Sequence, residues 1–307
     1  MTLVSIGLPV YCGERFLERS IRSILDQTFG DFELVVCDNA STDRTAEIVQ
    51  DLASRDKRIR YHRNEENIGA APNWNKAFRL STAPYFKWAS HDDVHEPTYL
   101  ERTLAVMRAD PGIVLCHTRT RLVDEDERDL PRDPATGHYV DRGGNLRHGP
   151  PRPGRATSPD PVVRFRDTFI EMVRCFDIFG LMRSDVLART SLHRSYYGSD
   201  RALLVEMSLY GRFHEVPEDL FLKREHSETT LSLSPDQQAK WIDPNGRRPS
   251  LLTRRMQYLQ ALQAVATAPL TLGERVRCLA VVANKPNWRG ALRRRLGPPH
   301  GATPARR

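Results

Sequence analysis

Two adjacent carboxylates, Asp92 and Asp93, follow a short apolar stretch and are well suited to binding a cation. Neighbouring carboxylates repel one another unless a cation or solvent separates them. Their hard oxygen ligands suit Mn²⁺ or Mg²⁺, which also take phosphate oxygens and water. Such a metal would bridge a diphosphate and neutralise its charge as it leaves. A bare Asp-Asp pair also occurs in solvated turns and before helices such as the one expected after Pro97, so its surroundings decide.

The elements that must position this pair alternate along the first 120 residues. Short apolar runs are separated by segments with helical apolar spacing, an order that implies right-handed crossovers. We therefore expect an α/β fold with a mostly parallel, Rossmann-like sheet and helices on both faces. The expected strands are Leu3–Val10, Phe32–Cys37, Ile59–His62, Pro84–Ser90 and Ile113–His117, and the expected helices are Glu14–Gln27, one beginning at Ser41–Asp43, Ala71–Leu80 and Pro97–Ala109.

This order of elements gives the acidic residues a common place. Asp38 follows the second expected strand, and Asp92 and Asp93 follow the fourth. Ligands of such sheets bind beyond the carboxyl ends of the strands. The local pattern alone therefore brings these three carboxylates to one edge of the sheet.

The rest of the chain divides into three stretches. Residues 126–166 hold seven of the 21 prolines and read as a long loop reaching toward a second substrate. Order is expected again over residues 167–235, with a helix from Asp200 to Tyr210 and a strand from Val216 to Leu222. Residues 236–307 form a helical extension, with helices at Leu251–Ala266 and Glu274–Ala283, and a basic tail from Arg289 that we expect to be disordered.

Composition narrows the class of protein. The 307 residues are 39 % hydrophobic and carry a formal net charge of +7, which suggests an anionic partner. Five widely spaced cysteines without a C-x-x-C pair favour reduced thiols over a disulfide scaffold or structural zinc. We see neither a signal peptide nor an apolar run of the roughly 18 residues that a membrane span needs. A cytoplasmic protein, at most peripheral to a membrane, is expected.

Four segments together resemble the family 2 glycosyltransferases. The first matches that family's Pro-x-Tyr-Asn-x-Glu opening, with Cys12 in place of the usual Asn, and the second matches its Asp-(Asp/Asn)-(Gly/Ala)-Ser-x-Asp motif. The resemblance covers residues 3–118 and continues more weakly to about residue 230. It implies a GT-A fold in a glycosyltransferase domain spanning residues 1–235, with a nucleotide-binding half at 1–120 and an acceptor half at 167–235. The matching segments are Ile6–Leu17, Phe32–Asp43, Asn67–Ala77 and Phe86–Asp93.

The resemblance assigns the nucleotide pocket. Asp38 would accept a hydrogen bond from the base, commonly uracil, because an unpaired buried donor costs about 1–3 kcal/mol. Asp43 would contact the ribose or merely cap the helix that follows. Gly69 would shape the pocket wall by close backbone approach. The other residues assigned to this pocket are Pro9, Tyr11, Glu14, Asn39 and Asn67.

The metal site and the diphosphate site follow from the same resemblance. The family's Asp-x-Asp motif corresponds to His91-Asp92-Asp93, so Asp93 is expected to be the more direct metal ligand. Asp92 would bind the ribose, the metal or a metal-bound water. His226 would complete the metal shell, and Arg224 would offer a bidentate fork to phosphate. The non-functional alternative for the segment from Lys223 to His226 is a solvated charged loop.

Inverting transfer needs a base near the acceptor hydroxyl, on the sugar face opposite the leaving group. Asp200 stands where the family carries its base, at the start of a helix, and is our first choice. Its alternative role is a helix N-cap. Glu206 is the second choice, one to two turns further along.

The sequence thus predicts a metal-dependent inverting glycosyltransferase that uses a nucleotide-diphosphate sugar, most simply a UDP-sugar, and an acceptor hydroxyl of unknown type. Polysaccharide, glycolipid and natural-product glycoside synthesis all remain open. A nucleotidyltransferase of similar fold is the enzymatic alternative, although residues 9–14 lack a Gly-rich phosphate loop. A basic nucleic-acid-binding protein is the other, although no such motif occurs. The C-terminal helices read as a lid or dimer face, or as a peripheral contact with an anionic membrane.

Overall fold

The computed structural model describes residues 2–140, 156–172, 175–227, 234–242, 244 and 253–284. An eight-stranded sheet runs through it in the order β3-β2-β1-β4-β7-β6-β8-β5. Four of the seven neighbouring pairs are parallel, namely β1 with β2, β1 with β4, β2 with β3, and β6 with β8. The strands are β1 (Val4–Val10), β2 (Phe32–Asp38), β3 (Ile59–Arg63), β4 (Tyr85–Trp88), β5 (Val94–His95), β6 (Ile113–Val123), β7 (Leu181–Arg183) and β8 (Arg212–Arg224).

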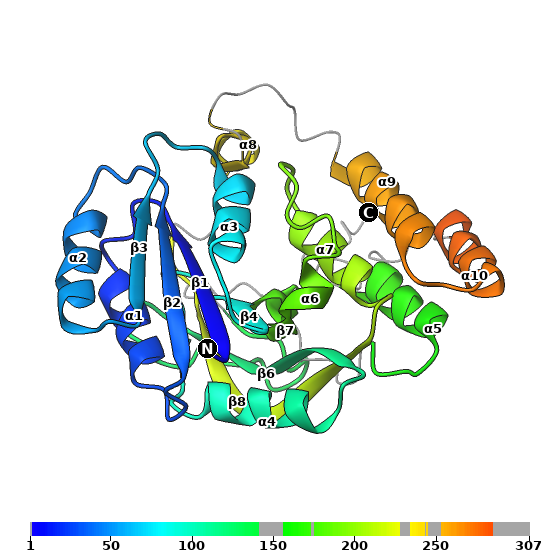
Figure 1. The fold of residues 1–307 in the computed structure, drawn as a ribbon, viewed down its shortest axis with the longest axis horizontal. Coiled ribbons are helices and arrows are strands. Elements are labelled where there is room, and N and C mark those ends of the chain that lie inside the picture. Colours follow the sequence, from blue (N-terminus) through cyan, green and yellow to red (C-terminus); the bar gives the residue numbers. More distant parts are fainter. Residues whose placement is uncertain are drawn as a thin grey trace, which may run out of the picture.

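Helices cover both faces of the sheet, as Figure 1 shows. The mostly parallel α/β fold that the sequence predicts is therefore confirmed. The helices are α1 (Leu17–Leu25), α2 (Thr45–Arg55), α3 (Ala70–Arg79), α4 (Tyr99–Ala109), α5 (Pro161–Arg166), η1 (Asp167–Glu171), η2 (Phe176–Phe179), α6 (Ser184–Leu187), α7 (Ser199–Met207), α8 (Pro235–Ile242), α9 (Thr253–Thr267) and α10 (Leu272–Ala283).

Strand β2 shows why the apolar runs are unbroken. Every one of its residues is buried, because both of its faces are covered. Leu34 and Val36 belong to the main core, whereas Val35 and Cys37 pack with Ala77 of α3. Successive side chains of a strand point to opposite faces, so a strand between two helical layers needs apolar residues at every position.

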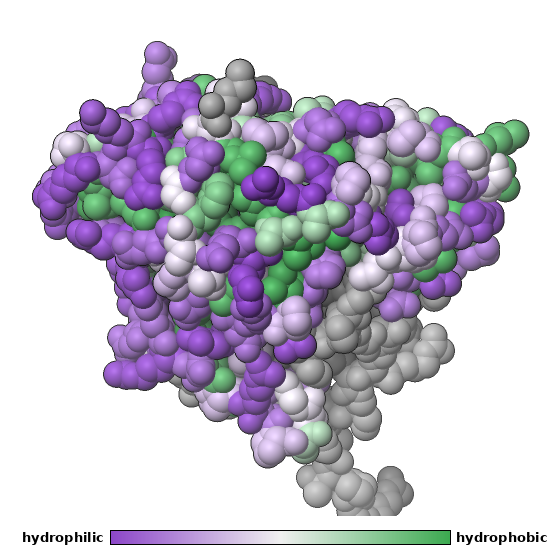
Figure 2. Space-filling model, turned by 60° about the horizontal axis from the view of Figure 1, so that its bottom comes forward, coloured by the Kyte–Doolittle hydropathy of each residue, from purple (hydrophilic) through white to green (hydrophobic). Residues whose placement is uncertain are grey.

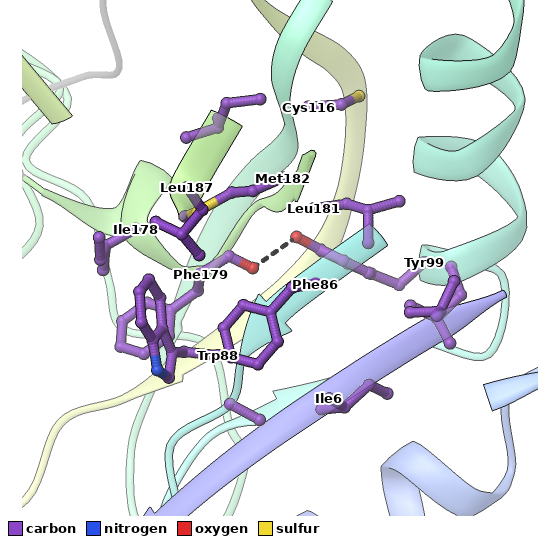
Figure 3. Close-up of a cluster of buried hydrophobic side chains, with 14 of the residues drawn as sticks. Ile6, Phe86, Trp88, Tyr99, Cys116, Ile178, Phe179, Leu181, Met182 and Leu187 are labelled. Carbon is purple, nitrogen blue, oxygen red and sulfur yellow. Dashed lines mark hydrogen bonds between the residues drawn. The ribbon is translucent and has the colours of Figure 1, made fainter. Parts of the chain in front are cut away.

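The centre of the core lies where β4, β7 and α4 meet. Figure 3 shows the rings of Phe86 and Trp88 from β4 packed edge to face, with centroids 4.9 Å apart. Beside them, the Tyr99 hydroxyl of α4 donates to the carbonyl of Phe179 at 2.9 Å. This bond ties the first half of the chain to the second, because the two residues are 80 positions apart.

Strand β8 is longer than the sequence pattern indicates, 13 residues instead of the expected seven, and β6 is likewise extended to Val123. The reason is pairing: β8 runs parallel to β6 along its length and antiparallel to the two residues of β5. Because β5 begins directly after Asp93, this pairing places the end of β8 beside the two aspartates.

The C-terminal helices do not stand apart from the rest. Helices α9 and α10 share a second apolar cluster with α5, η1 and α7, in which Val265 and Cys278 are fully buried. Figure 1 shows α5, α9 and α10 gathered at the end of the molecule away from α2. Helix α5 lies inside the stretch that we expected to be a loop, and Asp160 caps it by accepting from Val162 N at 2.8 Å.

One helix was not expected, and two stretches lie outside the described residues. Helix α8 was not expected from the sequence; it packs near α3. Residues 141–155 of the expected loop at 126–166, and the tail from Arg289, lie outside the described residues. Within the described part of the chain, no helix has the length and apolar character to cross a membrane.

Candidate active site

Asp38 ends β2 and lies wholly buried beneath the edge of the sheet. Its Oδ1 accepts from the backbone of Ser41 at 2.8 Å. Its Oδ2 accepts from the Tyr61 hydroxyl at 2.6 Å and from Arg63 Nη1 at 2.9 Å. Burial, with the neighbouring carboxylate, raises the pKa of Tyr61 to about 12, so this phenol stays a donor. Asp38 therefore reaches the edge with its carboxylate already fixed by three donors.

Two loops at the carboxyl ends of β1 and β2 brace one another. Cys12 N donates to Ser41 Oγ at 2.9 Å, and Glu14 N donates to Asp43 Oδ2 at 2.9 Å. In return, the carboxylate of Glu14 accepts from Arg44 N at 3.0 Å. The carboxylates of Glu14 and Asp43, both assigned to the nucleotide pocket, thus each bind the opposite loop. Two other residues at this end of β1 were assigned to the nucleotide pocket. Pro9 is buried in β1, and Tyr11, just after β1, is 44 % exposed.

Both loops begin with an unusual backbone conformation. Cys12 has φ +50° and Ala40 has φ +61°, in the left-handed region that disfavours side chains. Such conformations cost on the order of 1–3 kcal/mol each and persist where the surroundings fix them. The bonds from Cys12 to Ser41 and from Gly13 N to Thr45 Oγ1 at 2.9 Å supply that fixation.

Asn39 belongs to a network of amides rather than to an open surface. Its Nδ2 donates to Asn67 Oδ1 at 2.8 Å, and its Oδ1 accepts from Asn64 Nδ2 at 2.8 Å. Asn64 donates in turn to Asn73, and Lys76 Nζ donates to Asn64 Oδ1 at 2.6 Å. Asn39 and Asn67, both assigned to the nucleotide pocket, are therefore in direct contact, and this network fixes their side chains.

Gly69 is required for two reasons. Its φ is +86°, and a Cβ there would lie 2.5 Å from the carbonyl oxygen of Ile242 in α8. Helix α8 is the element that approaches the Gly69 backbone closely in this structure.

Asp92 lies in the bend between β4 and β5 and faces His226 from the end of β8. His226 Nε2 is 3.0 Å from Asp92 Oδ2, and Ser90 Oγ hydrogen-bonds to Asp92 Oδ1. Burial would raise the pKa of Asp92, but the nearby Lys223 ammonium and the His226 bond hold that pKa well below its usual range. Asp92 therefore presents a charged carboxylate next to an imidazole.

Asp93, which we expect to be the more direct metal ligand, faces Lys223 and the backbone of Arg224. Its side chain is wholly buried, with Oδ1 accepting from Lys223 Nζ at 3.0 Å and from Arg224 N at 3.1 Å. Burial raises the pKa of Asp93 to about 7, against the opposing charge of Lys223. Within the described residues its Oδ2 has no hydrogen-bond partner. The unpaired Oδ2 keeps Asp93 a candidate metal ligand beside Asp92, whose two oxygens face Ser90 and His226.

Arg224 does not present the free fork to phosphate that we expected. The side chain is 2 % exposed. Its Nε donates to Asp92 O at 2.8 Å, its Nη1 to Glu125 O at 2.7 Å, and its Nη2 to Glu127 Oε1 at 2.9 Å. The guanidinium also lies 4.7 Å from the ring centroid of Phe16. These contacts direct Arg224 inward, where it supports the loop that carries Asp92.

Asp200 is the second residue of α7, after Gly198 in the left-handed conformation with φ +81°. Its Oδ1 accepts from Arg201 N at 2.8 Å. Burial raises its pKa. A carboxyl group with a raised pKa is a stronger base once ionised, which suits proton abstraction.

Glu206, the second choice for the base, has a structural partner. Both of its carboxylate oxygens accept from Ser191 N at 3.1 Å, and Oε2 also accepts from Ser191 Oγ at 2.6 Å. The side chain is buried. Glu206 therefore holds the segment before α7 in place, and the geometry favours Asp200 for proton transfer.

Three residues in this region were not singled out from the sequence. Lys223 balances the two aspartates, lying 3.8 Å from Asp92 Oδ2 and 3.0 Å from Asp93 Oδ1. Tyr61 and Arg63 hold Asp38. Lys223 belongs to the charged segment from Lys223 to His226, where only Arg224 and His226 were given a role. Nothing in the local sequence around Tyr61 and Arg63 indicated that they would bind Asp38.

The arrangement fits a divalent cation that is shared with a substrate. Asp92 and His226 offer one carboxylate and one imidazole, both accepted by Mn²⁺. No cluster of three or more His, Cys, Asp or Glu side chains able to enclose a metal occurs in the part of the chain that the structure describes. A cation of this kind keeps waters and takes phosphate oxygens as its other ligands, so two protein ligands suffice.

Sequence comparison relates the chain to known glycosyltransferases. The model "Glycosyl transferase family 2" matches residues 5–186. The chain is 33 % identical over 124 residues to chondroitin synthase from Escherichia coli, covering 40 % of this chain and 18 % of that protein. It spans less than half of the length of the curated relatives that it matches.

Solved structures share the fold. S. aureus TarS 1-349 in complex with UDP-GlcNAc has a TM-score of 0.60 at 15 % identity, over 92 % of this chain and 72 % of that one. The mannosyltransferase PcManGT from Pyrobaculum calidifontis, in complex with GDP-Man and Mn²⁺, has a TM-score of 0.50 at 17 % identity, over 94 % and 77 %. The GT-A fold expected from the sequence is thereby confirmed. Because the family model covers more than half of its residues, the chain belongs to glycosyl transferase family 2.

Proposed function

We propose that this protein transfers a sugar from a nucleoside-diphosphate donor, a UDP-sugar first among them, to an acceptor hydroxyl with inversion at the sugar. Membership of the family favours this reaction over nucleotidyl transfer and over nucleic-acid binding. The observation that carries the proposal is the 3.0 Å approach of His226 to the charged carboxylate of Asp92, where strand ends from both halves of the chain meet.

The donor would lie along the braced edge of β1 and β2. Gly13 is so close to His91 that a Cβ on it would lie 2.8 Å from His91 Cδ2, so the loop after β1 borders the Asp92 bend. Asp38, Asp43 and the Asn39–Asn67 pair lie along the rest of this edge. A base and ribose bound there would direct the diphosphate toward Asp92.

Asp92 and His226 would hold Mn²⁺ or Mg²⁺, which would supply neutralisation of the leaving diphosphate. Lys223 adds a permanent positive charge behind them, 3.8 Å from Asp92 Oδ2. Asp200 would take the proton of the acceptor hydroxyl as its oxygen attacks the anomeric carbon. Its buried position raises its affinity for that proton.

Helix α10 has an exposed apolar face that a partner would cover. Helix α10 exposes Leu272 at 78 %, Val276 at 58 % and Leu279 at 41 %. Figure 2 shows hydrophobic side chains at the end of the molecule where α10 lies. This face suits either a second copy of the chain or a membrane that carries the acceptor, and we propose that one of these two covers it.

The experiment is thermal unfolding with UDP or GDP, each with and without Mn²⁺. Binding at 100 times Kd adds about 2.7 kcal/mol of stability. We expect stabilisation by UDP only when Mn²⁺ is present, and its loss in Asp92→Asn. Equal stabilisation with and without metal would contradict the metal site, and none with any nucleotide would contradict the donor class.

A further inference from the structure

Helix α9 meets the segment that precedes Asp200 with glutamines. Gln257, Gln260 and Gln263 recur at intervals of three residues and so share one side of the helix. All three hydrogen-bond to residues between 191 and 198, which lead directly into α7. Figure 1 shows α9 alongside α7 at this end of the molecule.

Gln260 is the centre of these contacts. It is 1 % exposed, and its amide is used at both ends. Its Nε2 donates to Ser191 Oγ at 2.8 Å, and its Oε1 accepts from the Tyr196 hydroxyl at 2.5 Å. Ser191 Oγ donates in turn to Glu206 of α7 at 2.6 Å. A chain of bonds therefore links α9, both ends of the segment and α7.

Gln257 acts closer to the base. Its Nε2 donates to the carbonyl of Gly198 at 3.1 Å. Gly198 is the left-handed residue before α7, and Asp200 follows two positions later. A hydrogen bond to that carbonyl fixes the peptide plane at the point where the chain turns into the helix. It therefore fixes the direction from which Asp200 enters the site.

We infer that Gln260 and Gln257 are positioning residues for Asp200, and that α9 is a working part of the acceptor site rather than a lid. This inference rests on the proposed function, since it gives Asp200 the role of base. Catalytic groups act only within a narrow geometry, and a displacement of about 1 Å caused by a distant substitution can lower a rate about 10²-fold. Buried polar contacts from a packed helix supply that rigidity.

The test compares Gln260→Leu and Gln257→Leu with Gln263→Leu as the matched control. Gln263 lies on the same helix but is exposed, and it binds Arg194, four residues before Gly198. The assay is release of nucleoside diphosphate from UDP-glucose, UDP-galactose, UDP-GlcNAc and GDP-mannose with Mn²⁺, using water as the acceptor. We expect kcat to fall about 10²-fold in Gln260→Leu and at least tenfold in Gln257→Leu. Donor KM should stay within twofold in both, and Gln263→Leu should match the wild type.

Two further measurements separate positioning from general damage. Tyr196→Phe removes the Gln260 bond from the other side, so the double variant with Gln260→Leu should lose no more kcat than the worse single variant. Hydrogen exchange should rise within residues 191–200 of Gln260→Leu and stay unchanged within residues 5–45. An unchanged kcat with unchanged exchange would overturn the inference, as would a fall in kcat with an equal fall in donor binding.

The outcomes distinguish this inference from the proposed function. Asp200→Asn is measured in parallel. If the wild type releases diphosphate, Asp200→Asn abolishes release and Gln260→Leu does not change it, only the inference fails. If Asp200→Asn retains the wild-type rate, the assignment of Asp200 as the base fails; if no donor is turned over with water, the exchange experiment alone decides whether α9 holds the segment. Should Gln260→Leu not fold, Gln257→Leu carries the test, because Gln257 is only partly buried.

Discussion

The loops at the edge of β1 and β2 and the segment before Asp200 are both fixed by side-chain hydrogen bonds, but over different distances along the chain. The edge loops are bound by partners 29 to 32 residues away, within one strand-helix-strand unit. The segment before Asp200 is bound by α9, whose partners are 59 to 69 residues away. The first region carries recognisable motifs because partners and spacing travel together in the sequence. The second depends on a helix that the family model, ending at residue 186, does not reach.

The sharpest test of this comparison is Asp200→Asn, which keeps the volume of the side chain and removes the base. We expect transfer to fall about 10²- to 10⁴-fold, because general base catalysis contributes that much. Nucleotide affinity should be unchanged, since it belongs to the other region. The control is Glu206→Gln, which should lose stability while retaining transfer per folded molecule. A reversed pair of results would move the base to Glu206.

Asp93→Ala tests whether this carboxylate contributes mainly to the stability of the fold or to metal binding. Removing this buried carboxylate leaves the Lys223 ammonium without its 3.0 Å partner. Breaking a buried ion pair costs about 3–5 kcal/mol, so we expect unfolding in urea at much lower concentration. Asp92→Asn is the contrast: it should weaken Mn²⁺-dependent UDP binding about 10- to 100-fold. Equal effects of both variants on metal binding would show that Asp93 is a ligand as well.

The contact of His193 with the first half of the chain should make the stability of the fold sensitive to acid. His193 packs against Trp74 and Trp88, and Asn75 hydrogen-bonds to both its backbone N–H and its carbonyl. Burial lowers the pKa of His193 to about 3 from 6.5. The folded state thus resists protonation that the unfolded chain accepts below pH 6.5. This contribution to stability is complete above pH 6.5 and is lost as pH falls toward 3.

By pH 5 the loss from His193 should reach about 2 kcal/mol in urea unfolding. His193→Phe removes the titrating group while keeping an aromatic ring. The fall in stability between pH 6.5 and 5 should be shallower in that variant by the same amount. Identical slopes in the two proteins would show that His193 does not carry this effect.

The smallest effect is expected for Tyr61→Phe, which removes one of three donors to Asp38. We expect a loss of about 1–2 kcal/mol of stability, because a buried carboxylate keeps two other donors. Nucleotide affinity should fall in parallel. Tyr11→Phe serves as the control, because Tyr11 is 44 % exposed and its removal should leave stability unchanged. An unaltered Tyr61→Phe protein would show that Ser41 and Arg63 suffice to fix Asp38.

Several features could be predicted from the sequence because their causes are local. Unbroken apolar runs such as Phe32 to Cys37 indicated strands buried on both faces. The alternation with helices then placed Asp38 and Asp92 at the same edge of a mostly parallel sheet. The free cysteines expected from their spacing are also found among the described residues. Helix α8 and the helical part of the proline-rich stretch were missed, because short helices have too few turns for a clear period.

A carboxylate pair after the fourth strand could be predicted from the sequence, but the partner that each carboxylate faces could not. The antiparallel pairing of β5 with β8 decided the matter, because it brought Lys223 against Asp93 and His226 against Asp92. The same holds for Asp200, whose motif was visible while its support by Gln260 depends on how α9 packs onto α7. Contacts between segments far apart in the chain leave no fixed spacing in the sequence, and so only the tertiary structure could supply them.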